Sequence, residues 1–169
     1  ALLAATGVFF FVATRGTLLV RGLSSAQNSA KSHVYPLYSD MRLIKLVDFQ
    51  PIISAILLFQ YHRLVSKIVD DMKRTNLAGK RVLITSYAFG NVIPRVVEAA
   101  IEGGAERVLI ADIIQNELVH AKTKLTQYAN KVEYIEDNAT ALKQPDGVAA
   151  ANIMFFLLHE LPHELKGRA

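Results

Sequence analysis

The feature that most constrains the fold of this chain is a pattern of two apolar runs separated by a helix-forming stretch, between residues 81 and 112. The runs at 82–85 and 107–111 have the length and the β-branched content of buried strands. Between them, Asn91 is a suitable N-cap, and the glycine pair at 103–104 is a suitable helix end. Because strand–helix–strand crossovers are right-handed, the sequence predicts two parallel, neighbouring strands.

Further apolar runs continue this pattern on both sides. The runs at 132–136 and 153–158 predict two more strands, and a helix is expected near 115–128. Residues 35–74 have helical periodicity, which Pro51 interrupts. The sequence therefore predicts an α/β fold with a three-layer, Rossmann-like sheet of four parallel strands, in the order 3-2-1-4, and helices on both faces. No fifth to seventh strand is expected, so the fourth strand would be an apolar edge that needs cover.

The N-terminal arm differs in composition from the rest of the chain. Residues 1–39 contain no Asp or Glu, whereas they contain Arg15, Arg21 and Lys31. Acid-poor, Arg- and Ser-containing N-termini are typical of mitochondrial targeting segments. The run at 1–23 is long enough to cross a bilayer, but Arg15 would then cost about 2.5–3.5 kcal/mol. We expect this hydrophobic helical arm to attach to a membrane. The alternatives are a leader, or an arm packed on another protein.

Composition excludes several classes of site and partner. The chain has no cysteine, so it has no disulfide, no thiolate metal site and no cysteine nucleophile. The formal net charge of +4 is modest, and no basic cluster is interleaved with aromatic residues, so nucleic acid is not an expected partner. We expect three segments: a hydrophobic arm and linker at 1–34, N-terminal helices at 35–78 and the sheet domain at 79–169.

The candidate site lies at the carboxyl edge of the predicted sheet, where such folds bind nucleotide-like ligands. Asp112 ends the second strand about twenty residues after the first turn, a spacing at which its carboxylate can accept hydrogen bonds from both ribose hydroxyls. The turn has the single glycine Gly90, whereas a dinucleotide fingerprint requires three, which argues against pyrophosphate. Asp137 is placed to bind an adenine amine, and His159 could act as an acid–base group or, with Glu160, bind a metal. The alternative is a strand–helix–strand unit that binds no ligand.

The expected cofactor-binding residues occupy the first turn and the ends of the second and third strands. They are Tyr87, Phe89, Gly90, Asn91, Asp112, Asp137 and Asn138, and the expected catalytic residues are His159 and Glu160. No metal ligands are assigned. For His159 and Glu160 an exposed turn is the alternative.

From about Gly79 onward the layout resembles a class I S-adenosylmethionine-dependent methyltransferase. Within that superfamily, FFLLHELP at 155–162 resembles the rhodoquinone-biosynthesis family RquA, and so do the AFGN turn at 88–91, Asp112 and the DNATAL segment at 137–142. The resemblance implies S-adenosylmethionine, used as an amino donor together with a divalent metal, in the conversion of ubiquinone to rhodoquinone.

The chain also departs from the methyltransferase pattern. Ile84 stands where most class I enzymes have an acid, and Ser86 and Ala88 stand where they have glycines. The strands that normally complete the fold on the substrate side are not expected in this sequence.

Three functions are compatible with these observations. The first is a non-catalytic, methyltransferase-like accessory subunit of a respiratory-chain complex in the mitochondrial inner membrane, with other subunits and membrane lipid as partners. The second is an active enzyme that uses S-adenosylmethionine and a metal to modify a quinone. The third is a soluble small-molecule methyltransferase, which leaves the hydrophobic arm unused. The arm, the open edge and the degenerate turn favour the first.

Overall fold

The computed structural model describes residues 41–57 and 59–169. The N-terminal arm expected at 1–34 therefore lies outside the described residues. Within the described part, no helix is long and apolar enough to cross a membrane.

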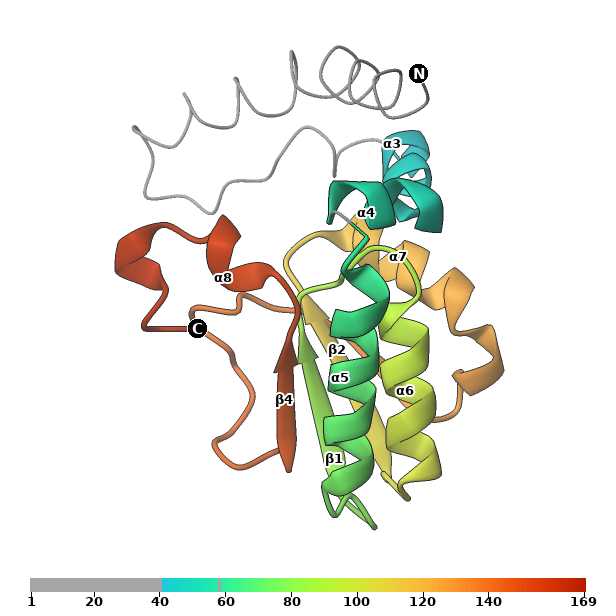
Figure 1. Ribbon diagram of the computed structural model, residues 1–169. Coiled ribbons are helices and arrows are strands. Elements are labelled where there is room, and N and C mark those ends of the chain that lie inside the picture. The colour runs from blue at the N-terminus through green and yellow to red at the C-terminus, as the bar shows by residue number, and fades with distance from the viewer. Residues whose placement is uncertain (1–40, 58) are drawn as a thin grey trace, which may run out of the picture.

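Four parallel strands form one sheet in the order β3-β2-β1-β4 (Figure 1). They are β1 (Arg81–Thr85), β2 (Arg107–Asp112), β3 (Val132–Glu136) and β4 (Ala151–Met154). In the register of this sheet, Val82 of β1 is the partner of Val108 in β2 and of Ala151 in β4. The predicted α/β fold, parallel pairing and strand order are confirmed.

Six α-helices and two 3-10 helices accompany the strands in the described part. The α-helices are α3 (Met41–Asp48), α4 (Gln50–Ile56), α5 (Tyr61–Arg74), α6 (Val92–Glu102), α7 (Gln115–Lys124) and α8 (Leu157–Glu160). The 3-10 helices are η3 (Thr126–Tyr128) and η4 (His163–Leu165). Pro51 lies in the first turn of α4, directly after the break between α3 and α4, as the sequence predicts. The helix expected at 115–128 is α7 followed by η3.

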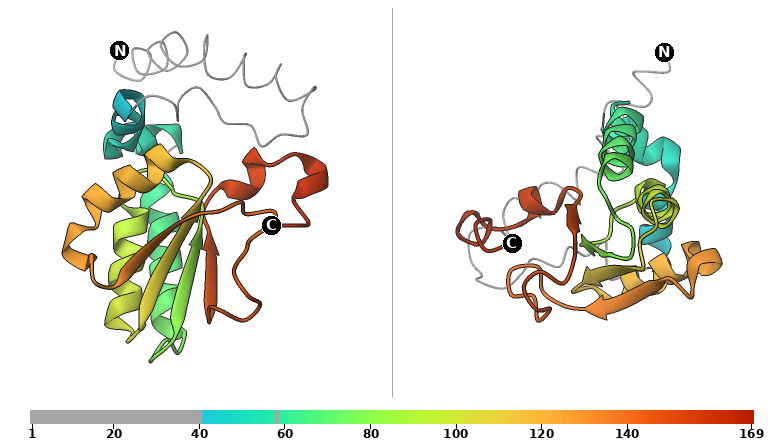
Figure 2. Two further views of the ribbon diagram at one scale, coloured as in Figure 1. Left: turned by 180° about the vertical axis from the view of Figure 1, so that it is seen from behind. Right: turned by 90° about the horizontal axis from the view of Figure 1, so that it is seen from below.

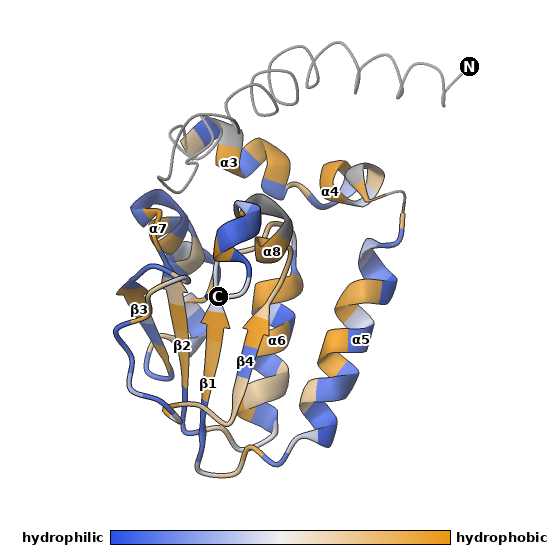
Figure 3. Ribbon diagram, turned by 90° about the vertical axis from the view of Figure 1, so that its left-hand side faces the viewer, coloured by the Kyte–Doolittle hydropathy of each residue, from blue (hydrophilic) through white to orange (hydrophobic). Residues whose placement is uncertain are grey.

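The helices α5, α6 and α7 pack on one face of the sheet (Figure 2). Their apolar stripes face the strands, and β1 and β2 are hydrophobic along most of their length (Figure 3). Val65 of α5, Val96 of α6 and Ala121 of α7 are fully buried in one cluster with Ile84 and Ile110. Burial of these stripes against the sheet stabilises the helices far more than their intrinsic propensity does.

Helices are also predicted on the second face of the sheet, but among the described residues no helix contributes to the apolar cluster there. On the second face Leu83, Leu109 and Ala111 pack against Ile135, Leu142 and Ala149, none of which belongs to a helix. The connection from β3 to β4 is irregular because it is rich in turn-forming residues, among them a Pro-Asp-Gly sequence at 145–147.

The fourth strand also differs from its prediction. It starts at Ala151 and ends at Met154, and Phe156 then adopts the left-handed conformation with φ 68°. Leu157 begins the short helix α8, so the second half of the predicted strand at 153–158 is a turn and a helix. A short apolar run fits a buried strand and a buried helix equally well, and periodicity alone does not separate them.

Candidate site at the carboxyl edge of the sheet

The turn between β1 and α6 depends on Gly90. Its φ is +79°, and a Cβ at this position would lie 2.3 Å from the Tyr61 hydroxyl oxygen. Ser86, at the start of the same turn, also has a left-handed φ of 72° although it is not glycine. The turn therefore needs one glycine for space, and it tolerates strain of about 1–3 kcal/mol at Ser86.

Tyr61 reaches this turn from α5 and takes the place of a helix cap. Its hydroxyl donates to the Phe89 carbonyl at 3.1 Å and accepts from the Val92 N–H at 2.8 Å. Burial raises the pKa of Tyr61 to about 12. Asn91 stands at the N-cap position, as predicted, but its side chain makes no capping hydrogen bond and its Oδ1 is buried without a partner. The sequence pattern could not reveal that the capping oxygen comes from a distant helix.

Asp112 joins two neighbouring turns. It is 4% exposed, and its Oδ2 accepts from the Tyr87 N–H at 2.6 Å while its Oδ1 accepts from the Ile114 N–H at 2.7 Å. Burial raises the pKa of Asp112, and the hydrogen bonds from Tyr87 and Ile114 oppose that effect. Both carboxylate oxygens are thus engaged with the protein backbone, and the residue predicted to bind a ribose orders the turns around it.

Asp137 and Asn138 have a similar structural role after β3. The two carboxylate oxygens of Asp137 accept from the N–H groups of Asn138 at 2.9 Å and Lys143 at 2.8 Å. The side-chain oxygen of Asn138 accepts from the Thr140 N–H at 3.0 Å and from its hydroxyl at 2.9 Å. These residues hold the first turn of the β3–β4 connection, in the way that Asp and Asn commonly do.

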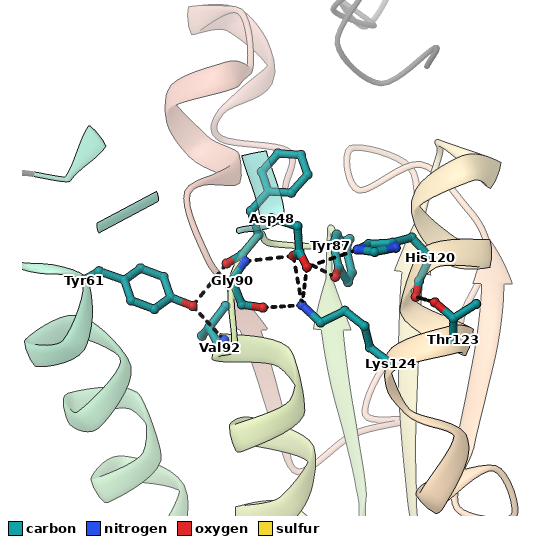
Figure 4. Close-up of polar contacts among 9 residues, drawn as sticks. Asp48, Tyr61, Tyr87, Gly90, Val92, His120, Thr123 and Lys124 are labelled. Atoms are coloured by element: carbon teal, nitrogen blue, oxygen red, sulfur yellow. Dashed lines mark hydrogen bonds and ion pairs between the residues drawn. The ribbon is translucent and has the colours of Figure 1, made fainter. Parts of the chain in front are cut away.

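Sequence reasoning missed Asp48, the residue on which the polar contacts of this edge converge (Figure 4). Its Oδ1 accepts from the Gly90 N–H at 2.9 Å and from the Tyr87 hydroxyl at 3.3 Å. Lys124 Nζ lies 2.8 Å from Oδ1 and 2.9 Å from Oδ2, and it also donates to the Gly90 carbonyl. Asp48 comes from α3, which lies over the carboxyl ends of the strands (Figure 1). An isolated acid after an apolar helix carries no sequence signal for such a contact.

His120 completes this cluster from α7. Its Nε2 lies 3.2 Å from Asp48 Oδ2, a distance typical of an ion pair, but the geometry is not that of a hydrogen bond and neither ring nitrogen has a hydrogen-bond partner. The imidazole packs edge-on against the Tyr87 ring with centroids 5.8 Å apart. Burial raises the pKa of Tyr87, and the nearby Asp48 carboxylate adds to that effect.

The structure brings some of the predicted site residues together. Tyr87, Phe89, Gly90 and Asn91 share the β1–α6 turn, which Asp112 supports from below, and Asp137 follows on the next strand. His159 and Glu160 lie in α8, after β4, and their side chains lie outside the described part of the structure. Among the described residues no three His, Asp or Glu side chains form a group that could hold a metal ion.

Comparisons of the chain with protein-family models, with curated proteins and with solved structures gave no match. The fold and the contacts described above are therefore the basis for a functional proposal.

Proposed function

We propose that this chain is a methyltransferase-like accessory subunit of a respiratory-chain complex in the mitochondrial inner membrane, and that it is non-catalytic. The observation that carries the proposal is that side chains of the protein itself fill the carboxyl edge of the sheet. A cofactor at this edge would need free donors at the β1–α6 turn and free acceptors at the strand ends.

One donor of the turn and one of α7 are directed to Asp48. Gly90 N–H and Lys124 Nζ both bind its carboxylate, at 2.9 and 2.8 Å. The acceptors at the strand ends are also engaged, because Asp112 and Asp137 each accept two backbone N–H groups. A cofactor would have to displace Asp48, and it would share the carboxylates of Asp112 and Asp137 with their backbone hydrogen bonds. This arrangement favours a scaffold that has kept the fold without the cofactor.

The proposed location and partners rest on the sequence and on the surface of the described part. The arm supports contact with membrane lipid, since it has no acidic residue and begins with the uncharged, mostly apolar run at 1–14. Several large apolar side chains of the described part are at least 41% exposed, which supports contacts with other subunits. They are Leu46, Phe49, Phe59, Leu64, Ile113, Val119 and Leu158.

One observation favours the second function, an active quinone-modifying enzyme. Asp48, Tyr87, His120 and Lys124 form a largely buried cluster of ionisable groups, and such clusters are common in active sites. In that case S-adenosylmethionine would place its ribose on Asp112 and its adenine near Asp137 and Asn138. Replacing Asp112 with Ala would then weaken binding by about 1.5–3 kcal/mol.

Native electrophoresis tests the proposal directly. Mitochondrial membranes are solubilised gently, the complexes are separated, and the chain is located by mass spectrometry. We expect it in a large respiratory complex, and we expect no heat of binding when S-adenosylmethionine is titrated into the isolated protein. A chain found only as a soluble monomer with quinone-modifying activity would establish the enzyme instead.

A further inference from the structure

The geometry points to a carboxylate-binding site over the β1–α6 turn, in which Asp48 is the built-in ligand and which accepts a small free carboxylate when the Asp48 side chain is removed. This inference does not depend on the proposed function, because it concerns only contacts within the chain.

The site is built from donors on two separate elements. The β1–α6 turn supplies the Gly90 N–H and the Tyr87 hydroxyl, and α7 supplies Lys124 Nζ (Figure 4). All three are directed at one carboxylate, with heavy-atom distances of 2.9, 3.3 and 2.8 Å to the same oxygen, Oδ1. A backbone N–H just before a helix and an ammonium group are both typical ligands of an anion.

His120 gives an independent indication of an anion site. Its side chain is 8% exposed, both ring nitrogens lack a hydrogen-bond partner, and Nε2 lies 3.2 Å from Asp48 Oδ2 (Figure 4). Lys124 is also largely buried, with 21% of its side chain exposed. Burying an ammonium group is unfavourable unless an anion neutralises it. Lys124 therefore requires a negative charge beside it, whichever molecule provides it.

Asp48 is held by this site and not by its own helix. It is the last residue of α3, where the helix dipole disfavours a carboxylate. Two oxygens of one planar group satisfy the donors, so the matching free ligand is a monocarboxylate such as acetate. Because Asp48 is attached to the chain, its effective concentration is about millimolar or higher, and free carboxylates do not compete well in the unaltered protein.

Chemical rescue of the Asp48→Ala variant tests this inference. Thermal unfolding of the isolated protein is followed with added sodium acetate, and with sodium chloride at the same ionic strength. We expect the variant to unfold about 5–10 °C lower than the unaltered protein, and acetate to restore a large part of this loss in a saturable manner. The matched control is Asp70→Ala, which removes an exposed carboxylate from α5 and should give neither the loss nor the rescue.

A double variant identifies the rescuing site. Adding Lys124→Met to Asp48→Ala should abolish the rescue, because the ammonium group that binds acetate is gone. The inference would be wrong if Asp48→Ala unfolded at the same temperature as the unaltered protein. It would also be wrong if acetate stabilised the Asp70→Ala control or the double variant equally well.

If Asp48→Ala does not fold, hydrogen exchange in the unaltered chain gives a second test. The Gly90 N–H should exchange at least about tenfold more slowly than an unprotected amide, because Asp48 accepts from it. Exchange of Gly90 as fast as that of an unstructured amide would overturn the inference without any variant.

Discussion

At the scale of single residues, Gly90 is the clearest case in which sequence and structure agree. The sequence marks it as the one glycine of the turn, and the structure gives the reason, since a Cβ would lie 2.3 Å from the Tyr61 hydroxyl oxygen and 2.7 Å from its ring. The substitution Gly90→Ala should therefore lower the free energy of unfolding by about 2–4 kcal/mol. Urea denaturation measures this loss.

Gly147 provides the matched control for that substitution. Its φ of +74° is close to that of Gly90, but nothing lies within 4 Å of an added Cβ. The substitution Gly147→Ala should therefore cost only the backbone strain, about 1–2 kcal/mol. Equal losses at both positions would show that the clash between the added Cβ and Tyr61 does not contribute to the loss of stability.

Asp112 leads to a prediction about pH. Burial raises its pKa above the ordinary 3.8, so the folded protein holds this proton more readily than the unfolded chain does. Between 3.8 and the raised pKa, the contribution of Asp112 to stability therefore falls as pH rises. The substitution Asp112→Asn removes this titration while keeping the size of the side chain.

We expect the difference in unfolding free energy, unaltered protein minus Asp112→Asn, to decrease as pH rises through this window. Denaturant titrations at a series of pH values measure it. A difference that grows with pH would mean that the two backbone hydrogen bonds outweigh burial, and that the pKa of Asp112 is lowered.

At the scale of elements, the sequence predicts the sheet well because each of the first three strands is a short apolar run between clear turns. The prediction fails for the fourth strand, where the apolar run continues through Phe155 to Leu158 although the chain turns at Phe156. At the β3–β4 connection, the turn-forming residues between 137 and 147 give irregular structure. For Asp112 and Asp137 the sequence predicts the position correctly, but it cannot tell a ligand-binding carboxylate from one engaged by backbone N–H groups.

The docking of α3 gives a prediction at this scale, with a control on the same helix. Ile44 of α3 is fully buried, whereas Leu46 is 52% exposed. The substitution Ile44→Ala should cost about 2–5 kcal/mol and should make α3 more susceptible to limited proteolysis. The substitution Leu46→Ala should cost less than about 1 kcal/mol. If both variants resisted proteolysis alike, α3 would not be held through Ile44.

At the scale of the whole molecule, the helices that lie over the carboxyl edge of the sheet cover this edge. On their outer surface they expose apolar side chains. Phe49 lies at the junction of α3 and α4, and Phe59 lies between α4 and α5; these residues are 60% and 67% exposed. Phe59 also has a left-handed φ of 61°, which costs about 1–2 kcal/mol for a residue with a Cβ. An exposed aromatic side chain held at a strained backbone position indicates a contact beyond the described residues, and we expect one there.

The substitution Phe59→Gly separates stability from assembly. Glycine relieves the left-handed strain but adds entropy to the unfolded chain, so the isolated protein should change in stability by less than about 1 kcal/mol. If the chain is the accessory subunit proposed above, the variant should lose a large part of its incorporation into the complex, because an apolar side chain at the expected interface is removed. Native electrophoresis with quantitative mass spectrometry measures the incorporated fraction, and Glu98→Ser on the exposed side of α6 serves as the control. Full incorporation of Phe59→Gly would mean that the partner surface lies elsewhere, whereas a large loss of stability in the isolated chain would mean that the ring serves the fold itself.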